Sequence, residues 1–254
     1  MKKRIKICVL IGSCNTRSTT QYLAEEIIKR YQSVTENIID VNIFSGKDTS
    51  ISDCTGCTNC FINGGCRLDR QDDMGAVKQA LLEADIIILG SPVYFHSVSG
   101  VMKRFMDRLS YWTHTMELTG KFGITIATSG GNGLTYVSEY LKKFSDYLGI
   151  QHLAAVEAAT YNMEYMEYHK VIEKIDGQIQ KCVDQIKLYV DKEEYFIPEK
   201  RQSQIFLAFQ EKNQRLNDYR DHIAEVNRWF EAGFHECKDY QEAISKKKKN
   251  LVTE

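Results

Sequence analysis

Residues 84–95 constrain the fold more than any other stretch, because they are typical of a strand buried on both faces. Four large apolar residues, Ile86–Leu89, follow one another there, and three of them are β-branched. Such runs are typical of parallel sheets that are covered by helices on both sides. Since proline cannot donate to a strand ladder, we expect the strand to stop at Gly90-Ser91-Pro92 and to present Tyr94 just beyond its end.

Strand and helix patterns alternate over the first 157 residues. Helical periodicity is expected at Asp72–Glu83, Ser99–Trp112 and Tyr136–Leu148. The alternation predicts an α/β fold with a doubly wound parallel five-stranded sheet, and ligands of such sheets bind outside the carboxyl ends of the strands. Besides the central strand, the expected strands are Arg4–Ile11, Ile38–Phe44, Phe122–Thr128 and about Leu153–Glu157.

The pattern changes from about Asn162, where apolar residues recur at helical spacing for nearly thirty residues. Two further helical patterns follow Pro198. We therefore divide the chain into residues 1–160, an α/β domain, and residues 161–254, a C-terminal helical extension. Packing within the same chain is the simplest use of its apolar faces, although a second subunit could also cover them.

Charge and hydropathy exclude several classes of protein. The net charge is −1 at pH 7, which provides no electrostatic basis for binding nucleic acid or a membrane surface. No apolar run reaches the ~18 residues that a transmembrane helix needs. The apolar run Ile5–Ile11 follows Met-Lys-Lys-Arg and reaches Gly12 with no cleavage site after it, so we interpret it as a strand and expect a cytoplasmic protein.

Two loops rich in glycine and hydroxyl groups follow predicted strands. The first, residues 12–20, opens a helix, where backbone N–H groups and the helix dipole favour an anion such as phosphate. An ordinary helix cap explains the same residue types, since Ser, Thr and Asn are preferred there. The second, Ser129–Gly133, is small enough to let a ligand approach the backbone closely.

Four blocks of residues, in this order, resemble the flavodoxin-like family of NAD(P)H-dependent FMN reductases, including its iron–sulfur flavoprotein branch. The resemblance covers roughly residues 4–160 and implies the flavodoxin-like form of the expected sheet. The blocks are Gly12-Ser13 with Ser18-Thr19-Thr20; Cys54, Cys57, Cys60 and Cys66 with Asp72-Asp73-Met74; Ser91-Pro92-Val93-Tyr94 with Ser99-Gly100, Lys103, Phe105 and Asp107-Arg108; and Ser129-Gly130-Gly131.

The resemblance implies a binding site for FMN. Family members often have Pro-Arg after the Gly-Ser of the first loop, where this chain has Cys14-Asn15. Either Arg17 takes the place of that arginine, or backbone N–H groups and hydroxyls hold the phosphate. The resemblance further implies that the helix containing Lys103, Asp107 and Arg108 forms structural ion pairs. The FMN-binding residues that it implies are Ser13, Arg17, Ser18, Thr19 and Thr20 for the phosphate, and Pro92, Val93, Tyr94, Phe95, Ser129, Gly130 and Gly131 for the isoalloxazine ring.

Cys54, Cys57, Cys60 and Cys66 have the spacing C-x2-C-x2-C-x5-C, and clustered thiols in a reducing compartment more often hold a metal or do redox chemistry than form disulfides. The resemblance implies that these four bind a [4Fe–4S] cluster. Zinc also accepts four thiolates, although its sites usually pair two separated knuckles. Thiols that hold no metal and line a loop beside the flavin remain a third interpretation.

The resemblance implies an oxidoreductase in which NAD(P)H, a transient visitor, delivers hydride to FMN. Electrons would then reach a small-molecule acceptor such as free flavin or a quinone, with the cluster as a possible intermediate. A second hypothesis is an electron-transfer protein that is fed by ferredoxin and does not turn over NAD(P)H. A third is a binding module with structural zinc. Members of this family usually assemble as homodimers or homotetramers, so we expect the same here.

Overall fold

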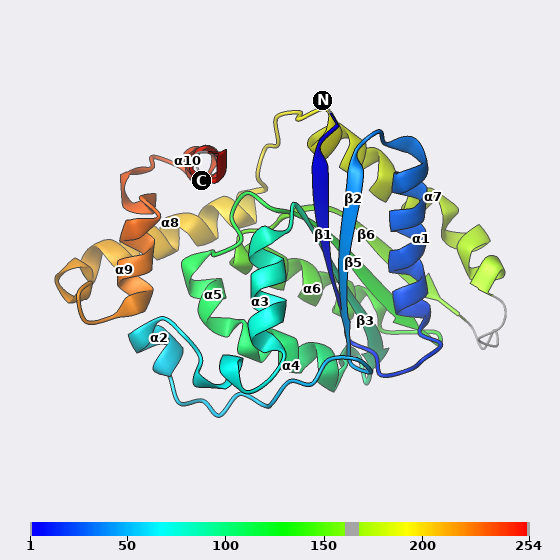
Figure 1. The fold of residues 1–254 in the computed structure, drawn as a ribbon, viewed down its shortest axis with the longest axis horizontal. Helices are drawn as coiled ribbons and strands as arrows, with labels where there is room; N and C mark the ends of the chain where they lie inside the picture. Colours follow the sequence, from blue (N-terminus) through cyan, green and yellow to red (C-terminus); the bar gives the residue numbers. More distant parts are fainter. Residues whose placement is uncertain (1, 161–167, 253–254) are drawn as a thin grey trace.

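The computed structural model describes residues 2–160 and 168–252 and contains a central parallel sheet. The expected helical pattern at 162–167 lies outside the described residues. Five parallel strands run in the order β2-β1-β3-β5-β6, which is the flavodoxin-like order and confirms the predicted fold class (Figure 1). They are β1 (Arg4–Ile11), β2 (Ile38–Ser45), β3 (Ile86–Tyr94), β5 (Phe122–Ser129) and β6 (Gln151–Ala159).

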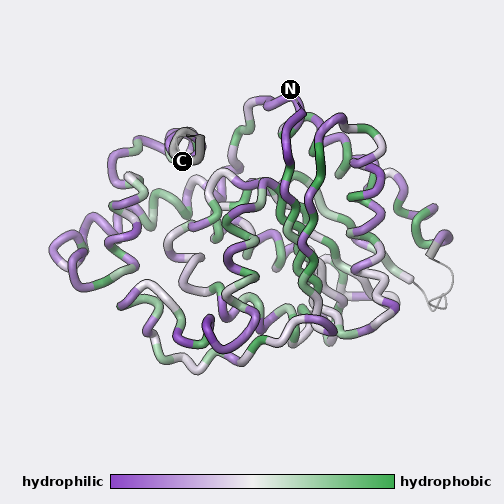
Figure 2. Tube along the Cα trace, viewed as in Figure 1, coloured by the Kyte–Doolittle hydropathy of each residue, from purple (hydrophilic) through white to green (hydrophobic). Residues whose placement is uncertain are grey.

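Helices cover both faces of this sheet (Figure 1). Alternate residues of β1 enter opposite cores: Val9 packs in the core with α1 (Thr19–Val34) and α7 (Tyr168–Ile186), while Leu10 packs in the other. The strands accordingly form an apolar centre between more polar helices (Figure 2). The helices on the second face are α3 (Met74–Glu83), α4 (Gly100–Arg108), α5 (Ser110–Thr115) and α6 (Leu134–Leu148).

The prediction that the central strand stops at Gly90-Ser91-Pro92 is wrong. Strand β3 continues to Tyr94, and Pro92 pairs with Thr128 of β5. Pairing with β1 already ends at Gly90, so Pro92 lies at a free edge on that side and its missing N–H breaks no ladder there. The last two residues of β3 then pair with the short antiparallel β4 (Ser97–Val98).

The single helix expected at Ser99–Trp112 is divided in two. Leu109 has φ −100° and ψ 0°, which ends α4 at Arg108 before α5 begins at Ser110. The helix expected from Asp72 begins two residues later, at Met74, because the carboxylates of Asp72 and Asp73 bind backbone N–H groups of the preceding loop instead.

The C-terminal region divides between two packing environments. Helix α7 packs against the sheet beside α1, and the π-helical turn Lys187–Asp191 follows it. Helices α8 (Lys200–Arg215), α9 (Ala224–Glu231) and α10 (Tyr240–Val252), the last of which the sequence analysis missed, surround an apolar cluster of their own. That cluster contains Met116, Phe206, Trp229, Phe234 and Tyr240. The division into domains at residue 160 stays a prediction. No helix within the described residues has the length and apolar character needed to cross a membrane.

Replacing Gly177 with alanine should stabilise the protein. Gly177 lies inside α7, and a Cβ built on it would have no heavy atom within 4 Å. Alanine loses less conformational entropy than glycine in a helix, so we expect the free energy of unfolding to rise by about 0.5–1 kcal/mol. Urea denaturation measures this change, and a lower denaturation midpoint for the variant would contradict the prediction.

Candidate functional site at the carboxyl edge of the sheet

The loop after β1 lies at the point where the strand order reverses, between β1 and β3. The Gly12 N–H donates to the carbonyl oxygen of Gly90 at 2.7 Å, which joins the loop to the end of the β1–β3 pairing. The hydroxyl of Ser18 caps α1 by accepting from the N–H of Gln21, as the alternative explanation of this loop proposed. Ser13 accepts from the N–H of Asn15, and Arg17 is exposed on the loop.

The turn between β3 and β4 exposes aromatic side chains in an unusual backbone conformation. Phe95 and His96 have φ of 48° and 58°, in the left-handed region that two-residue hairpins require and that Asn-Gly usually fills. For bulky residues this conformation costs of order 1–3 kcal/mol each. Phe95 is fully exposed and Tyr94 is 60% exposed. The surrounding structure therefore maintains a strained turn that presents two aromatic rings to solvent.

The loop after β5 lies beside this turn. A Cβ on Gly133 would lie 2.8 Å from Cγ1 of Val93, so glycine allows the two loops to touch. Ser129 accepts hydrogen bonds from the N–H groups of Gly131 and Asn132, which closes the loop on itself. A Cβ on Gly130 or Gly131 would have no heavy atom within 4 Å, so one side of this loop is open.

The predicted FMN residues thus lie on three loops at one edge of the sheet. Strand β3 lies between β1 and β5, and its loop contacts the loop after β5. Thr20, at the start of α1, connects the loop after β1 to strand β5, because its hydroxyl lies 2.6 Å from the hydroxyl of Thr128. The Thr20 hydroxyl therefore points towards β5 and helps to hold the two loops together. A helix N-terminus for an anion and an open, glycine-lined surface are the features that this edge offers a ligand.

The cysteine loop is a second feature of the same end of the molecule. All eight cysteines, each within the described residues, are free thiols. Cys54 and Cys57 are exposed, while Cys60, within α2 (Asn59–Asn63), and Cys66, in the loop after it, are partly buried. Within residues 2–160 and 168–252, no three His, Cys, Asp or Glu side chains gather as a metal site. The cluster prediction therefore remains a prediction.

The environments of the thiols differ. A backbone N–H hydrogen bond from Asn59, together with one from the Thr55 hydroxyl, lowers the pKa of the exposed Cys57 thiol. Burial, reinforced by the charge of Cys66, raises the pKa of Cys60. Without a metal, the exposed Cys57 thiol is therefore a stronger acid than the partly buried Cys60 thiol.

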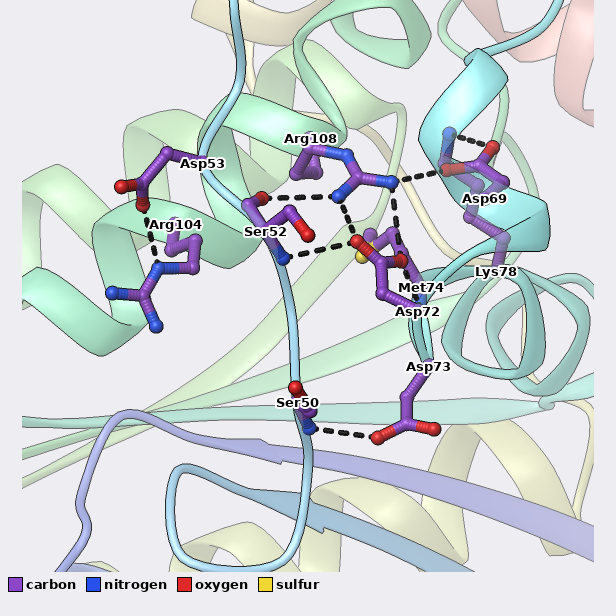
Figure 3. Close-up of polar contacts among 10 residues, drawn as sticks. All are labelled: Ser50, Ser52, Asp53, Asp69, Asp72, Asp73, Met74, Lys78, Arg104 and Arg108. Atoms are coloured by element: carbon purple, nitrogen blue, oxygen red, sulfur yellow. Dashed lines mark hydrogen bonds and ion pairs between the residues drawn. The ribbon is translucent and has the colours of Figure 1, made fainter.

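Arg108 forms hydrogen bonds with residues before and after the cysteine loop, Ser52 on one side and Asp69 and Asp72 on the other (Figure 3). Its guanidinium donates to the carbonyl oxygen of Ser52 at 3.0 Å, to Asp72, and to Asp69 at 2.8 Å. The Arg108 side chain is fully buried and Asp72 is 4% exposed. We call Arg108, Asp69 and Asp72 the arginine clamp. Arg104 and Asp53 form a second, exposed pair beside it, so the prediction of structural ion pairs on this helix agrees with the observed contacts.

Asp72 makes the clamp sensitive to acid. Burial alone would raise the pKa of its carboxyl, but hydrogen bonds from Arg108 and from the N–H groups of Ser52 and Met74 lower it from 3.8 to about 2. Because the pKa is lower in the folded state, its contribution to stability is complete above the unfolded value and is lost as pH falls towards about 2. In urea denaturation, the wild-type protein should exceed Asp72→Asn in stability at pH 6, with the difference disappearing near pH 2. A constant difference would contradict this.

Comparison with known proteins is consistent with this geometry. Residues 5–163 match the family described as NADPH-dependent FMN reductase. The chain belongs to that family. An iron-sulfur flavoprotein of Archaeoglobus fulgidus is 33% identical over 129 residues, 51% of this chain and 56% of the relative. An iron-sulfur flavoprotein of Clostridioides difficile is 24% identical over 234 residues, 89% and 98% of the two chains.

This member of the FMN reductase family spans about 56% and 61% of the length of the first two archaeal relatives that it matches. Among solved structures, an FMN-dependent NADH-azoreductase of Bacillus anthracis in complex with FMN shares the fold, with a TM-score of 0.55 at 15% identity. That likeness covers 71% of this chain and 99% of the other. At this level of identity, the likeness establishes the shared fold alone.

The sequence analysis of this FMN reductase family member missed two contacts and the conformation of one turn at this edge of the sheet. The hydroxyls of Thr128 and Thr20 contact each other, and the Ser99 hydroxyl donates to the carbonyl oxygen of Gly12 at 2.5 Å. The strained Phe95-His96 turn has neither glycine nor asparagine, so turn statistics gave no signal for it. The position of Ser99 at the start of α4 could have been anticipated, because serine is preferred immediately before a helix. There it caps the helix by accepting from the N–H of Met102.

Replacing Gly12 with alanine should weaken FMN binding at least about tenfold and destabilise the protein by about 1–3 kcal/mol. The new Cβ would lie 2.6 Å from both Cβ of Met102 and Oγ of Ser99, so the loop after β1 must move away from α4. Gly100→Ala is the control, because a Cβ there has no heavy atom within 4 Å. Fluorescence titration with FMN measures the affinity, and equal affinities for the two variants would contradict the prediction.

Proposed function

We propose that this chain binds FMN at the carboxyl edge of β1, β3 and β5 and passes electrons from NAD(P)H to a small acceptor such as a flavin or a quinone. The observation that carries the proposal is the meeting of the three loops at the strand-order reversal, joined by the Gly12–Gly90 and Thr20–Thr128 contacts. The family match supports it.

The residues of this edge fit the cofactor in kind. Ser13, Arg17, Ser18, Thr19 and backbone N–H groups at the start of α1 would hold the phosphate. Pro92–Phe95 would lie against one side of the ring, and Ser129–Gly131, with open space around the two glycines, would approach the other. FMN supplies the acceptor for hydride, so the chain itself needs no acid, base or nucleophile.

We also propose that Cys54, Cys57, Cys60 and Cys66 bind a [4Fe–4S] cluster. Four free thiols within residues 54–66 are the donor set that such a cluster takes. A Cβ on Gly56 or Gly65 would meet no heavy atom within 4 Å, so the loop has room to close around it. Metal sites commonly form only as the metal binds, which agrees with thiols that are not yet gathered.

A spectrum with iron and sulfide assays on protein purified without oxygen tests both proposals. We expect flavin absorption, a broad shoulder near ~400 nm, and about four iron and four sulfide per chain. Cys57→Ala should lose the iron and keep the flavin, while Cys14→Ala, outside the cysteine loop, should keep the iron. Flavin with no iron would overturn the cluster, iron replaced by zinc would indicate a structural site, and protein that binds no FMN would overturn the main proposal.

A second candidate is an electron-transfer protein fed by ferredoxin. It is favoured by the name of several relatives, iron-sulfur flavoprotein, which mentions no reductase activity. Steady oxidation of NADH or NADPH with 1,4-benzoquinone as acceptor would support the first candidate. Reduction by reduced ferredoxin, with no oxidation of either nicotinamide, would support the second.

We further propose that the protein is cytoplasmic and assembles as a homodimer or homotetramer. Phe95, Tyr94 and Tyr136 are exposed aromatic side chains around the proposed flavin edge, and a second subunit would cover them. Sedimentation of the purified chain tests the assembly, and a monomer at micromolar concentration would overturn it.

A further inference from the structure

Two hydrogen-bond donors at the junction of α4 and α5 are buried without a partner in the described part of the chain. They are Nε of Arg108 and the hydroxyl of Tyr111. The exposed fractions of these residues are 4% and 3%. Buried polar groups are nearly always hydrogen-bonded, and an unsatisfied one costs free energy. These two donors therefore call for an acceptor that the polypeptide itself does not supply.

Both donors lie in the part of the protein against which the cysteine loop packs. The ring of Tyr111 contacts the ring of Phe61 edge to face, with centroids 5.7 Å apart. Cys60 and Phe61 pack against the same apolar cluster that contains Tyr111. The 3-10 turn that follows Cys66 carries Asp69, which accepts from Arg108 (Figure 3). The donors therefore lie on the side of the loop where Cys60 and Cys66 are partly buried.

We propose that the Tyr111 hydroxyl and Nε–H of Arg108 donate hydrogen bonds to sulfur atoms of the cluster at its Cys60–Cys66 end, and so raise its reduction potential. This inference rests on the proposed [4Fe–4S] site. The sulfur atoms of thiolates and sulfides are acceptors, and they become more negative when the cluster gains an electron. Donors that bind them would therefore stabilise the reduced form more than the oxidised form.

The proposed hydrogen bonds also agree with the different exposure of the four cysteines. Cys54 and Cys57 face solvent, where water can donate to their sulfur atoms. Cys60 and Cys66 are turned towards the protein, and the two buried donors replace water there. Tyr111 and Arg108 are positioning residues in this scheme, since neither would bind the iron.

Tyr111→Phe tests the proposal, because it removes the hydroxyl and leaves the ring against Phe61. Arg108 is unsuitable, since it also forms the arginine clamp. Tyr189→Phe is the matched control, because Tyr189 packs against Phe122 in the core on the other face of the sheet. The probes are the iron content, the reduction potential of the cluster in a dye titration, and the urea denaturation midpoint of protein stripped of iron.

In Tyr111→Phe we expect the cluster to be present and its equilibrium with the dye to shift at least about threefold towards the oxidised form. Tyr189→Phe should behave as wild type. The iron-free Tyr111→Phe protein should be no less stable than wild type, since an unpartnered hydroxyl is removed. An unchanged potential with full iron would overturn the role of Tyr111 and leave the cluster standing. A destabilised iron-free variant would show that the hydroxyl has a protein partner, which also overturns the proposal. Wild-type protein without iron would overturn the cluster itself.

Discussion

Arg108→Met should lower the free energy of unfolding by about 3–5 kcal/mol, because it leaves Asp72 buried without a charged partner, whereas Asp69 keeps its ion pair with Lys78. Asp72 is 4% exposed and Asp69 is 19% exposed, and both accept from the Arg108 guanidinium. Methionine fills part of the same volume but donates nothing. Urea denaturation monitored by circular dichroism measures the effect.

Arg104→Met is the matched control for this variant. Arg104 lies on the same helix and pairs with Asp53, but the two side chains are 40% and 86% exposed. Exposed pairs contribute about 0–1 kcal/mol, so this variant should stay close to wild type. Equal stabilities of the two variants would show that the arginine clamp does not hold the loop. Arg108→Met should also lose iron on purification, because both ends of the cysteine loop are released.

Arg228→Met should destabilise the protein by about 2–3 kcal/mol, through the pair that joins α9 to the segment after α5. The Arg228 guanidinium donates to both carboxylate oxygens of Glu117 at 2.6 Å. Glu117 is 4% exposed, whereas Arg228 is 42% exposed, so solvent screens part of the pair. Without Arg228, the hydroxyl of Thr115 is the remaining hydrogen-bond donor to this carboxylate among the described contacts.

The pH dependence of this second variant distinguishes lost charge pairing from lost packing. Burial would raise the pKa of Glu117, but Arg228 outweighs it and holds the pKa below the usual 4.5. The pair therefore stabilises the protein above that value and ceases to do so as pH falls through the folded pKa. The deficit of Arg228→Met should shrink as the pH is lowered below 4.5. Arg215→Met, which removes an exposed pair with Glu211 in the same helical region, should change stability by less than about 0.5 kcal/mol.

The sheet could be predicted from sequence because its signals are local. Apolar residues, many of them β-branched, run through β1 and β3 and place each strand. The strand β1 was predicted with the observed bounds, Arg4–Ile11. The end of β3 was not predicted correctly. Pro92 would end the strand only if β1 were still paired beside it, and the sequence of one strand does not show how far its neighbour extends.

The meeting of the three loops at the candidate site was predictable for the same reason. Three loops follow three adjacent strands, so their residues had to meet. The buried donors of Arg108 and Tyr111 were not predictable, because neither residue type at that position signals an unpartnered atom. Nor does a sequence indicate that Leu109 interrupts the helix, since leucine is a good helix former and the break is decided by packing around it.

The contact between α9 and the cysteine loop has a consequence for the order in which the protein is assembled. A Cβ on Gly64 would lie 3.3 Å from the Cβ of Ala224, so residues about 160 positions apart in the chain are neighbours. A ribosome that adds 5–20 residues per second needs roughly ten to thirty seconds between the two. During that interval the four thiols have emerged without the helix that later covers one side of their loop. Iron delivered at that stage would meet an open loop, and the arriving helix would then close over a loop already loaded.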